Sequence, residues 1–275
     1  MKLFAKKRQS ETADRHDLYQ QSVQDTGSEI DFIEDTWNAL RDRPAELLRE
    51  DFCGTANTAC EWVRRDAHHY AIGVDLDPEV LAWGMRHCVG RLNPDEQQRI
   101  ELIRGNVLDP RPERSDIVLA MNFSYFLFMT RAALLEYFTT VHAGLEDDGI
   151  FFLDAYGGYD APREIEESRD CGDFVYIWDQ ASFNPIDSSM TCHIHFEFPD
   201  GSRMNEAFSY HWRLWTLPEL SELLYEAGFD QVDVYWEGTD EEANEGNGIY
   251  QPSTIGDADA GWVCYIVAQR RTDST

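Results

Sequence analysis

The chain has 275 residues, of which 43% are hydrophobic and 13% aromatic, so it can bury a substantial core as one large domain or two small ones. Its net charge of -29 repels phosphate backbones and anionic membrane surfaces, which argues against nucleic acid and membrane partners. There is no run of eighteen apolar residues and no secretory signal, so we expect a cytoplasmic protein. The acidity leaves two interpretations open, adaptation to high salt or an acidic cytosolic protein of ordinary salinity.

Six cysteines lie far apart without a CxxC pair, which predicts reduced thiols and no metal site. After a polar start, apolar residues at helical spacing predict a helix over much of 28–41, within an N-terminal helical cap of residues 1–45. Short apolar runs then alternate with helical patterns. The expected elements are a strand at 47–52, a helix at 57–65, a strand at 71–75, a helix at 78–92, strands at 100–104 and 116–121, a helix at 130–145 and a strand at 149–156. This alternation predicts a parallel sheet covered by helices, over a core of 46–156.

The pattern changes after residue 156. Residues 157–215 alternate aromatic and polar side chains, with a PDGS turn at 199–202, which predicts an inserted or appended antiparallel layer. A capped helix follows, with Thr216 as its N-cap, Glu219 three residues on and Gly228 near its end. Strands are expected at 231–236 and 262–269, joined by an acidic, glycine-rich mobile loop over 237–261. All these segments belong to one predicted domain, in which 216–270 forms the C-terminal helix and strand pair.

The loop after the first strand, EDFCGTA at 50–56, stands where a dinucleotide-binding fold has GxGxxG. Aligned on Gly54, that template meets Phe52 at its first glycine and Asn57 at its third. A pyrophosphate cradle therefore fits poorly, while a ligand without phosphates is compatible with the loop.

EDFCGTA resembles the first motif of class I S-adenosylmethionine-dependent methyltransferases, an acid followed by GxGxG, with Glu50 at the acid and Phe52, Gly54 and Ala56 at the glycines. The resemblance covers roughly 46–156 and 216–270. It implies a doubly wound, seven-stranded, mostly parallel sheet with an antiparallel last strand, plus an antiparallel insert after strand 5. It also implies S-adenosyl-L-methionine as the cofactor, bound through Tyr19, Glu50, Phe52, Cys53, Gly54, Thr55, Ala56, Asp75, Leu76, Asn106, Val107, Asn122, Phe123 and Ser124.

Within that set, the resemblance assigns Asp75 to the ribose hydroxyls, and Asn106 and Val107 to adenine. It places Asn122, Phe123 and Ser124 beside the methyl-transfer site. The Pro-Pro-aromatic tail of enzymes that methylate nucleic-acid bases is missing after Asn122. Tyr19 is expected to cover the cofactor or to have a simple packing role.

The predicted insert carries the candidate catalytic residues. In MTCHIHFEF, strand alternation points His193, His195 and Glu197 to one face and Cys192, Ile194, Phe196 and Phe198 to the other. The histidines are candidates for a base or a metal site, although such a row is more often the wet face of a strand. Arg213 is a candidate to grip a substrate carboxylate, or an ion-pair partner of a nearby acid. Tyr210, Trp212 and Trp215 form either an amine cage or core packing.

The sequence therefore predicts an enzyme that moves a methyl group to N or O of a small-molecule acceptor. Two alternatives stay open: an NAD(P)-dependent oxidoreductase, and a non-catalytic protein that binds the same adenosyl ligand. The acceptor, the use of a base and the oligomeric state stay open as well, with a homodimer among the options.

Overall fold

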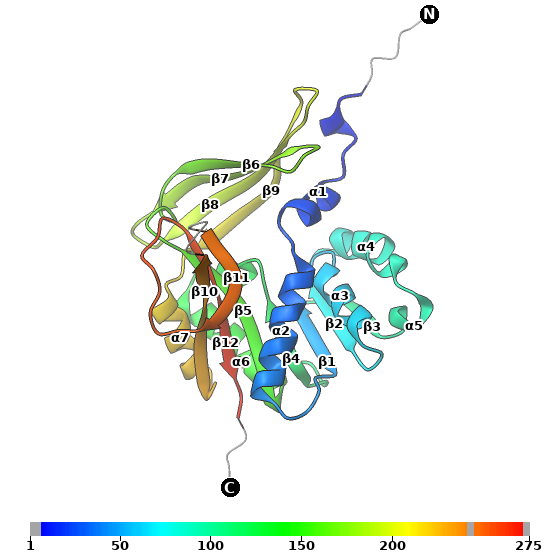
Figure 1. Ribbon diagram of the computed structural model, residues 1–275, viewed down its shortest axis with the longest axis vertical. Coiled ribbons are helices and arrows are strands. Elements are labelled where there is room, and N and C mark those ends of the chain that lie inside the picture. Colours follow the sequence, from blue (N-terminus) through cyan, green and yellow to red (C-terminus); the bar gives the residue numbers. More distant parts are fainter. Residues whose placement is uncertain (1–6, 241–244, 272–275) are drawn as a thin grey trace, which may run out of the picture. The chain divides into compact units, whose positions relative to one another are not determined.

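The computed structural model describes residues 7–240 and 245–271, which form two compact units (Figure 1). The core unit holds residues 26–158 together with those from 215 onward. The insert unit holds residues up to 25 together with 159–214. The segment 1–45, which we expected to form a helical cap, contributes residues to both units. In the described residues, no helix has both the length and the apolar character needed to cross a membrane.

The described strands of the core unit form an eight-stranded sheet in the order β11-β10-β12-β5-β4-β1-β2-β3. Strands β1 to β5 run parallel to one another, and β12 pairs antiparallel with both β5 and β10. This mostly parallel sheet with an antiparallel last strand confirms the predicted fold class. The strand bounds are β1 (Leu47–Asp51), β2 (Tyr70–Asp75), β3 (Ile100–Arg104), β4 (Ser115–Ala120), β5 (Leu145–Gly157), β10 (Gln231–Asp240), β11 (Glu245–Pro252) and β12 (Trp262–Gln269).

Strand β11 is an addition to the seven strands expected, and the prediction of a loop over all of 237–261 was wrong in this part. Tyr250 on β11 explains the difference, because its ring packs on Phe32 and Tyr265 with centroids 6.0 and 4.6 Å away. Composition had suggested that this acidic segment buries nothing, yet one aromatic side chain with two partners fixes the strand to the sheet. The four residues between β10 and β11 lie outside the described part of the chain.

Helices α4 and α7 begin where local capping signals place them, while α4 ends at His87 and not at the predicted residue 92. Asp77 caps α4 by accepting from the Glu79 N–H at 2.8 Å, with Pro78 in the first turn. Thr216 and Glu219 form the predicted capping box of α7. The core helices are α2 (Thr26–Leu40), α3 (Asn57–Arg65), α4 (Pro78–His87), α5 (Pro94–Gln97), α6 (Arg131–Gly144) and α7 (Leu217–Glu226), with 3-10 turns η2 (Val89–Arg91) and η3 (Ser124–Leu127).

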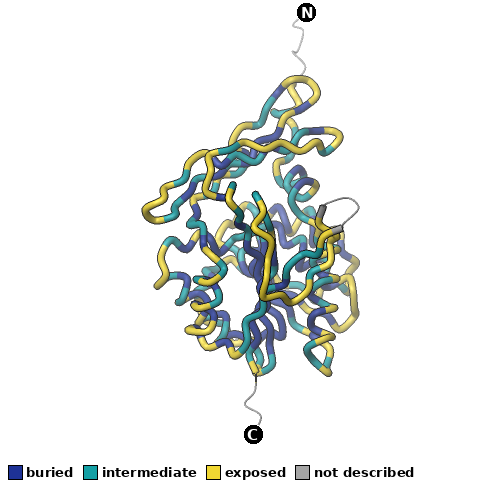
Figure 2. The backbone as a smooth tube through the Cα atoms, turned by 60° about the vertical axis from the view of Figure 1, so that its left-hand side comes forward, coloured by how far each residue is buried: buried dark blue, intermediate teal, exposed yellow. Residues whose placement is uncertain are grey.

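Both faces of the core sheet are covered. Apolar residues of α2, α3 and α4 share one buried cluster with sheet residues, while α6 packs against β5 and α7. Every residue of β4 is buried, as expected for a central strand with helices on both faces. The buried backbone of the core unit gathers along these central strands (Figure 2). The loops at the carboxyl ends of the parallel strands are thereby fixed on a rigid layer.

The insert unit contains an antiparallel sheet in the order β6-β7-β8-β9, together with η1 (Gln9–Glu11) and α1 (Arg15–Ser22). Its strands are β6 (Ile165–Asp170), β7 (Val175–Asn184), β8 (Ser189–Glu197) and β9 (Arg203–Arg213). The predicted alternation along β8 is present, because Ile194, Phe196 and Phe198 share a buried cluster with Leu18 of α1. An antiparallel layer after strand β5 is thus confirmed.

Candidate active site

The loop after β1 keeps the backbone of a glycine-rich turn without its glycines. Phe52, Gly54 and Ala56 all adopt positive φ, at 56°, 53° and 57°. These three positions are the ones that match the glycines of GxGxG. A non-glycine residue in this region costs about 1–2 kcal/mol, so the loop holds two strained residues. Strain of this kind persists where the surrounding structure over-determines it, which is common at binding sites.

Two glycines elsewhere in the chain make room for this loop. A Cβ on Gly73 of β2 would lie 2.9 Å from the Cys53 Sγ, and a Cβ on Gly84 of α4 would lie 2.5 Å from the Thr55 carbonyl oxygen. Close approach, which one glycine of the usual motif allows, is supplied here by the neighbouring strand and helix. Sequence reasoning missed both residues. A glycine inside a helix costs about 1 kcal/mol relative to alanine, so Gly84 in the middle of α4 could have indicated a close contact with another segment.

Asp75 lies at the carboxyl end of β2, the edge of the sheet where the sequence placed it. Its Oδ2 accepts from the Gly54 N–H at 2.9 Å, and its Oδ1 accepts from the Asp77 N–H at 2.9 Å. The carboxylate therefore ties the loop after β1 to the start of α4. Its oxygens keep further lone pairs, so it can still accept from hydroxyl groups of a ligand. Leu76 beside it is 65% exposed.

Glu50 is buried beneath the same loop. Its Oε2 accepts from the Ala59 N–H at the start of α3, at 2.9 Å. Burial raises the pKa of Glu50 to about 8, the Ala59 N–H lowers it, and the carboxylates of Glu29, Asp75 and Asp51 raise it further. Among the described residues, no basic side chain forms an ion pair with Glu50 or Asp75. A carboxyl group in this state gains stability when a cation binds beside it.

The Phe52 ring does not fill the space beside Gly54. It packs against Phe128 and Tyr137, with ring centroids 6.1 and 5.4 Å apart. A Cβ built on Gly54 meets no atom within 4 Å, so open space lies next to the loop backbone. Cys53 is a buried thiol whose pKa burial raises well above its usual value, which suits packing rather than reactivity.

The loop after β3 contains Asn106 and Val107, the predicted adenine contacts. The Asn106 Oδ1 accepts from the Leu108 N–H at 3.0 Å, which closes a tight turn, while Val107 is buried. The Gly105 N–H donates to the Asp75 carbonyl oxygen at 3.0 Å, so this turn lies beside the end of β2. The structure thus places the loops of β1, β2 and β3 along one edge, and contact of Asn106 with adenine stays a prediction.

The loop after β4 carries Asn122, Phe123 and Ser124. Asn122 and Phe123 have φ of 57° and 56°, so four of the six non-glycine residues with positive φ in the described chain belong to the loops after β1 and β4. Both of their N–H groups donate at 2.8 Å to Asp154 of β5. Asp154 was missed, because in the sequence it is one polar residue inside the apolar strand IFFLDAY.

The insert unit holds the predicted catalytic residues on one face of its sheet. The His193 Nδ1 lies 2.8 Å from the Ser209 Oγ, and Arg213 follows on β9 with its register partner Ser189 on β8. His195 is buried, its Nδ1 accepts from the Glu206 N–H at 2.7 Å, and its Nε2 lies 3.3 Å from the Asp179 Oδ2. This arrangement fixes the proton of the neutral ring on Nε2.

Glu166, Asp179 and His195 lie close enough to hold a metal ion. A neutral His195 offers it no lone pair, because Nδ1 already accepts a hydrogen bond and Nε2 carries the proton.

The opposite face of the insert sheet is aromatic. Tyr210 stacks on Trp212 with centroids 4.5 Å apart, and Trp178 lies within about 6 Å of both rings. Tyr19 of α1 packs on Phe208 of the same face, at 5.0 Å. These contacts match the packing alternative for Tyr19 and for Tyr210 and Trp212. Trp215 belongs to the core unit and is buried there, and a cage formed by all three rings stays a prediction. Roles for these residues and for His193, His195 and Arg213 in substrate binding stay predictions.

No family model and no curated protein sequence matches the chain. Solved structures do. A S-adenosylmethionine-dependent methyltransferase from Clostridium acetobutylicum is 16% identical, with a TM-score of 0.70 over 94% of this chain and 98% of that one. The amino pentose methyltransferase CalS10 from Micromonospora echinaspora, solved with S-adenosylmethionine bound, is 15% identical, with a TM-score of 0.64 over 93% and 95%.

The sugar N-methyltransferase KedS8 from a Streptoalloteichus species is also 15% identical, with a TM-score of 0.63 over 99% of this chain and 97% of that one. Identities this low show a shared fold, and the coverage shows that the fold extends over nearly the whole chain. The chain has the fold of these S-adenosylmethionine-dependent methyltransferases.

Proposed function

We propose that the protein binds S-adenosylmethionine and transfers its methyl group to a small-molecule acceptor. The observation that carries the proposal is the loop at 52–56, which keeps three positive φ angles at a strain cost and is tied to Asp75 through the Gly54 N–H. The buried carboxyl of Glu50 lies under that loop without a basic partner in the described chain. Together they form an acidic site with open space beside Gly54, in which a bound cation would favour the ionised form of Glu50.

A dinucleotide fits this site poorly. In dinucleotide-binding folds the pyrophosphate sits at the N-terminus of the helix after the first strand. Here the Glu50 carboxyl already accepts the Ala59 N–H at the start of α3, and Glu29 and Asp75 add negative charge around it. The charges of Glu29 and Asp75 would repel a pyrophosphate here, whereas a cationic cofactor would be attracted. This disfavours the NAD(P)-dependent alternative.

When bound, S-adenosylmethionine supplies a methyl group on a positively charged sulfur. The residues of this chain then have three tasks, which are to orient the cofactor, to align the acceptor and to exclude water. Glu50 and Asp75 are suited to the first task. The loop at 122–124 is suited to the second, because β4 is the neighbour of β1 in the sheet.

We propose nitrogen as the first acceptor atom to test. Two structures with this fold are an amino pentose methyltransferase and a sugar N-methyltransferase. In addition, the core unit has a cavity of about 570 Å³ at the carboxyl end of β10. Trp236, Trp262, Glu237, Asp257 and Asp259 line it, and the described part of its lining contains no basic residue. Carboxylates and indole rings favour an ammonium group over an anion.

Isothermal titration with S-adenosylmethionine, NAD and NADP tests the cofactor. We expect binding of the first alone, and at least tenfold weaker binding in Asp75→Asn, which removes the charge from the predicted ribose ligand. An Asp95→Asn variant, changed in the short helix α5, serves as the control. Binding of NAD or NADP without S-adenosylmethionine would overturn the proposal.

Formation of S-adenosylhomocysteine with a panel of amines and alcohols tests the transfer itself. We expect turnover with an amine. Tight binding with no turnover on any acceptor would favour the non-catalytic alternative.

A further inference from the structure

Asp154 is a buried carboxyl group that the cofactor site described above does not use. It lies on β5, is 8% exposed, and has no ion-pair partner among the described residues. Burial raises its pKa to about 7, although the N–H groups of Phe123 and Asn122 lower it. Burying a carboxyl without a base is costly, so this residue needs an explanation.

The side-chain hydrogen bonds of Asp154 all go to one loop. Its Oδ2 accepts from the Asn122 N–H and its Oδ1 from the Phe123 N–H, each at 2.8 Å, so each carboxylate oxygen holds one amide. The Asp154 carbonyl oxygen accepts from the Tyr125 hydroxyl at 2.7 Å. Hydrogen bonds to a charged acceptor are about twice as strong as neutral ones. The carboxylate therefore offsets the strain of two consecutive residues at positive φ.

We call the two hydrogen bonds from the Asn122 and Phe123 N–H groups to the Asp154 carboxylate the clamp. The clamp uses the N–H of Asn122 and leaves its other hydrogen-bonding groups available. The Met121 carbonyl oxygen accepts from Ser124, and the Phe123 carbonyl oxygen accepts from the Phe126 N–H at 2.9 Å. No hydrogen bond joins the carbonyl oxygen or the carboxamide of Asn122 to any residue in the described part of the chain. The loop follows β4, next to β1 and its strained loop, and Asn122 is only partly buried.

We infer that Asp154 is a positioning residue, which holds Asn122 and Phe123 so that the carbonyl and carboxamide of Asn122 orient the acceptor nucleophile. The inference rests on the proposed methyl transfer and adds to it a residue outside the cofactor site. Asp154 acts through the loop and not on the acceptor itself, so its loss is expected to lower kcat and leave cofactor binding unchanged.

The matched control is Asp116, at the opposite edge of the same sheet. It is also buried, and its Oδ2 accepts from two consecutive N–H groups, those of Glu46 and Leu47, at 2.7 and 2.9 Å. Asp116→Asn therefore weakens a similar pair of backbone hydrogen bonds, together with an ion pair to Arg43, at a distance from the loop after β4. Comparing it with Asp154→Asn separates a general loss of stability from a loss of positioning.

The test measures kcat with the best amine of the acceptor panel, the Kd for S-adenosylmethionine, and amide hydrogen exchange at Asn122 and Phe123. For Asp154→Asn we expect kcat to fall about a hundredfold, the Kd to stay within about threefold, and exchange at both amides to accelerate. Asp116→Asn should keep kcat within about twofold of the unmodified protein.

Three results would overturn the inference: an unchanged kcat in Asp154→Asn, a Kd that weakens as much as kcat, or a kcat loss of equal size in Asp116→Asn. If Asp154→Asn does not fold, amide hydrogen exchange in the unmodified protein still tests the inference. Fast exchange at the Asn122 and Phe123 amides would show that the clamp does not form. Failure of the unmodified protein to bind S-adenosylmethionine would instead reject the proposed function, and the exchange measurement would still judge the clamp.

Discussion

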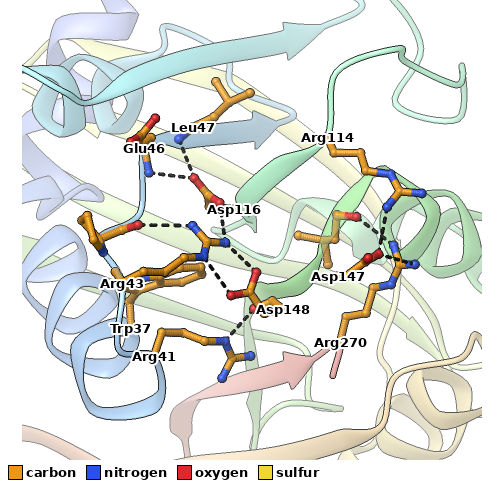
Figure 3. Close-up of polar contacts among 12 residues, drawn as sticks. Trp37, Arg41, Arg43, Glu46, Leu47, Arg114, Asp116, Asp147, Asp148 and Arg270 are labelled. Carbon is orange, nitrogen blue, oxygen red and sulfur yellow. Dashed lines mark hydrogen bonds and ion pairs between the residues drawn. The ribbon is translucent and has the colours of Figure 1, made fainter. Parts of the chain in front are cut away.

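The two edges of the core sheet both carry buried or half-buried carboxylates, but only one edge neutralises them. At the amino edge, Arg43 contacts Asp116 at 2.7 Å and Asp148 at 2.8 Å (Figure 3). The Arg43 guanidinium holds the pKa of Asp148 below its usual range. Asp147 likewise pairs with Arg114 and Arg270, at 2.9 and 3.0 Å. The carboxylates of Asp116, Asp147 and Asp148 are thus neutralised by arginines of the same chain. These ion pairs stabilise the fold, and the carboxylates need no cationic ligand.

At the carboxyl edge, Glu50, Asp75 and Asp154 have no basic partner among the described residues, and their oxygens accept backbone N–H groups instead. The pKa values of Glu50 and Asp154 are raised to about 8 and about 7 by burial. Two cavities show the same contrast. Arg43 and Arg114 line a cavity at the amino edge, whereas no basic residue is among the described residues that line the cavity at the carboxyl end of β10. The acids at the amino edge of the sheet thus stabilise the fold through ion pairs, whereas the acids at the carboxyl edge are available to a bound cation.

The largest expected effect is on cofactor affinity. Replacing the ionisable carboxyl in Glu50→Gln should weaken S-adenosylmethionine binding about a hundredfold. Attraction between an ionised Glu50 and a cation about 4 Å away is worth about 4 kcal/mol, which exceeds the cost of about 1.4 kcal/mol for ionising a group with a pKa of about 8 at pH 7. Glu61→Gln, on the same helix α3 as the Ala59 N–H, is the control and should change little. Titration calorimetry measures both. Equal affinities for the two variants would show that the carboxyl edge does not recruit the cofactor by charge.

The next effect concerns the amino edge and stability. Asp116→Asn should lower the free energy of unfolding by about 2 kcal/mol, because it weakens two buried backbone hydrogen bonds and the pair with Arg43. Cofactor affinity should stay the same. Denaturant unfolding and calorimetry together check this. A large loss of affinity would mean that the two edges are coupled and that the comparison fails.

A smaller effect is expected from pH. The ionised form of Glu50 attracts a cation, and its pKa of about 8 means that the unliganded site is mostly protonated at neutral pH. Binding should therefore release a proton, and affinity should rise up to about tenfold per pH unit below that pKa. Stability has the opposite sign. A raised carboxyl pKa makes the folded state bind more protons, so the unliganded protein loses stability as pH rises from about 4.5 to about 8.

Calorimetry in two buffers of different ionisation enthalpy measures the released proton, and thermal unfolding across the same range measures the stability. Glu50→Gln should flatten the affinity profile and reduce the slope of the stability profile, to which Asp154, with its pKa raised to about 7, also contributes. A pH-independent affinity in the unmodified protein would place the Glu50 pKa outside this range.

The smallest effect tests the strained loop. Gly54→Ala places a Cβ in open space at φ 53°, so it should cost about 1–2 kcal/mol of stability from backbone strain alone. Gly201→Ala, at φ 74° and equally open in the insert unit, is the matched control with a similar stability cost. We expect weaker cofactor binding for the first variant only. Equal affinities would show that the open space beside Gly54 is not the cofactor site.

Local chemistry was enough to predict much of the core. Helix α3 begins and ends at the predicted Asn57 and Arg65, and Asp77 and Thr216 cap the helices expected of them. These features depend on neighbours within a few residues, which a sequence states directly. Strand β2 ends at Asp75 for a similar reason, since the change from apolar residues to LDP marks the end of the strand.

The sequence by itself determined the fold class, the helix caps and the edge of the sheet that holds the acids, because these follow from periodicity and from side chains near in the chain. Only the tertiary structure decided which glycines leave space for the loop at 52–56, which carboxyl accepts the Asn122 and Phe123 N–H groups, and which acids form ion pairs with an arginine. Each of these is a contact between segments far apart in sequence, and its energy depends on burial and on the absence of a competing partner, neither of which a linear pattern contains.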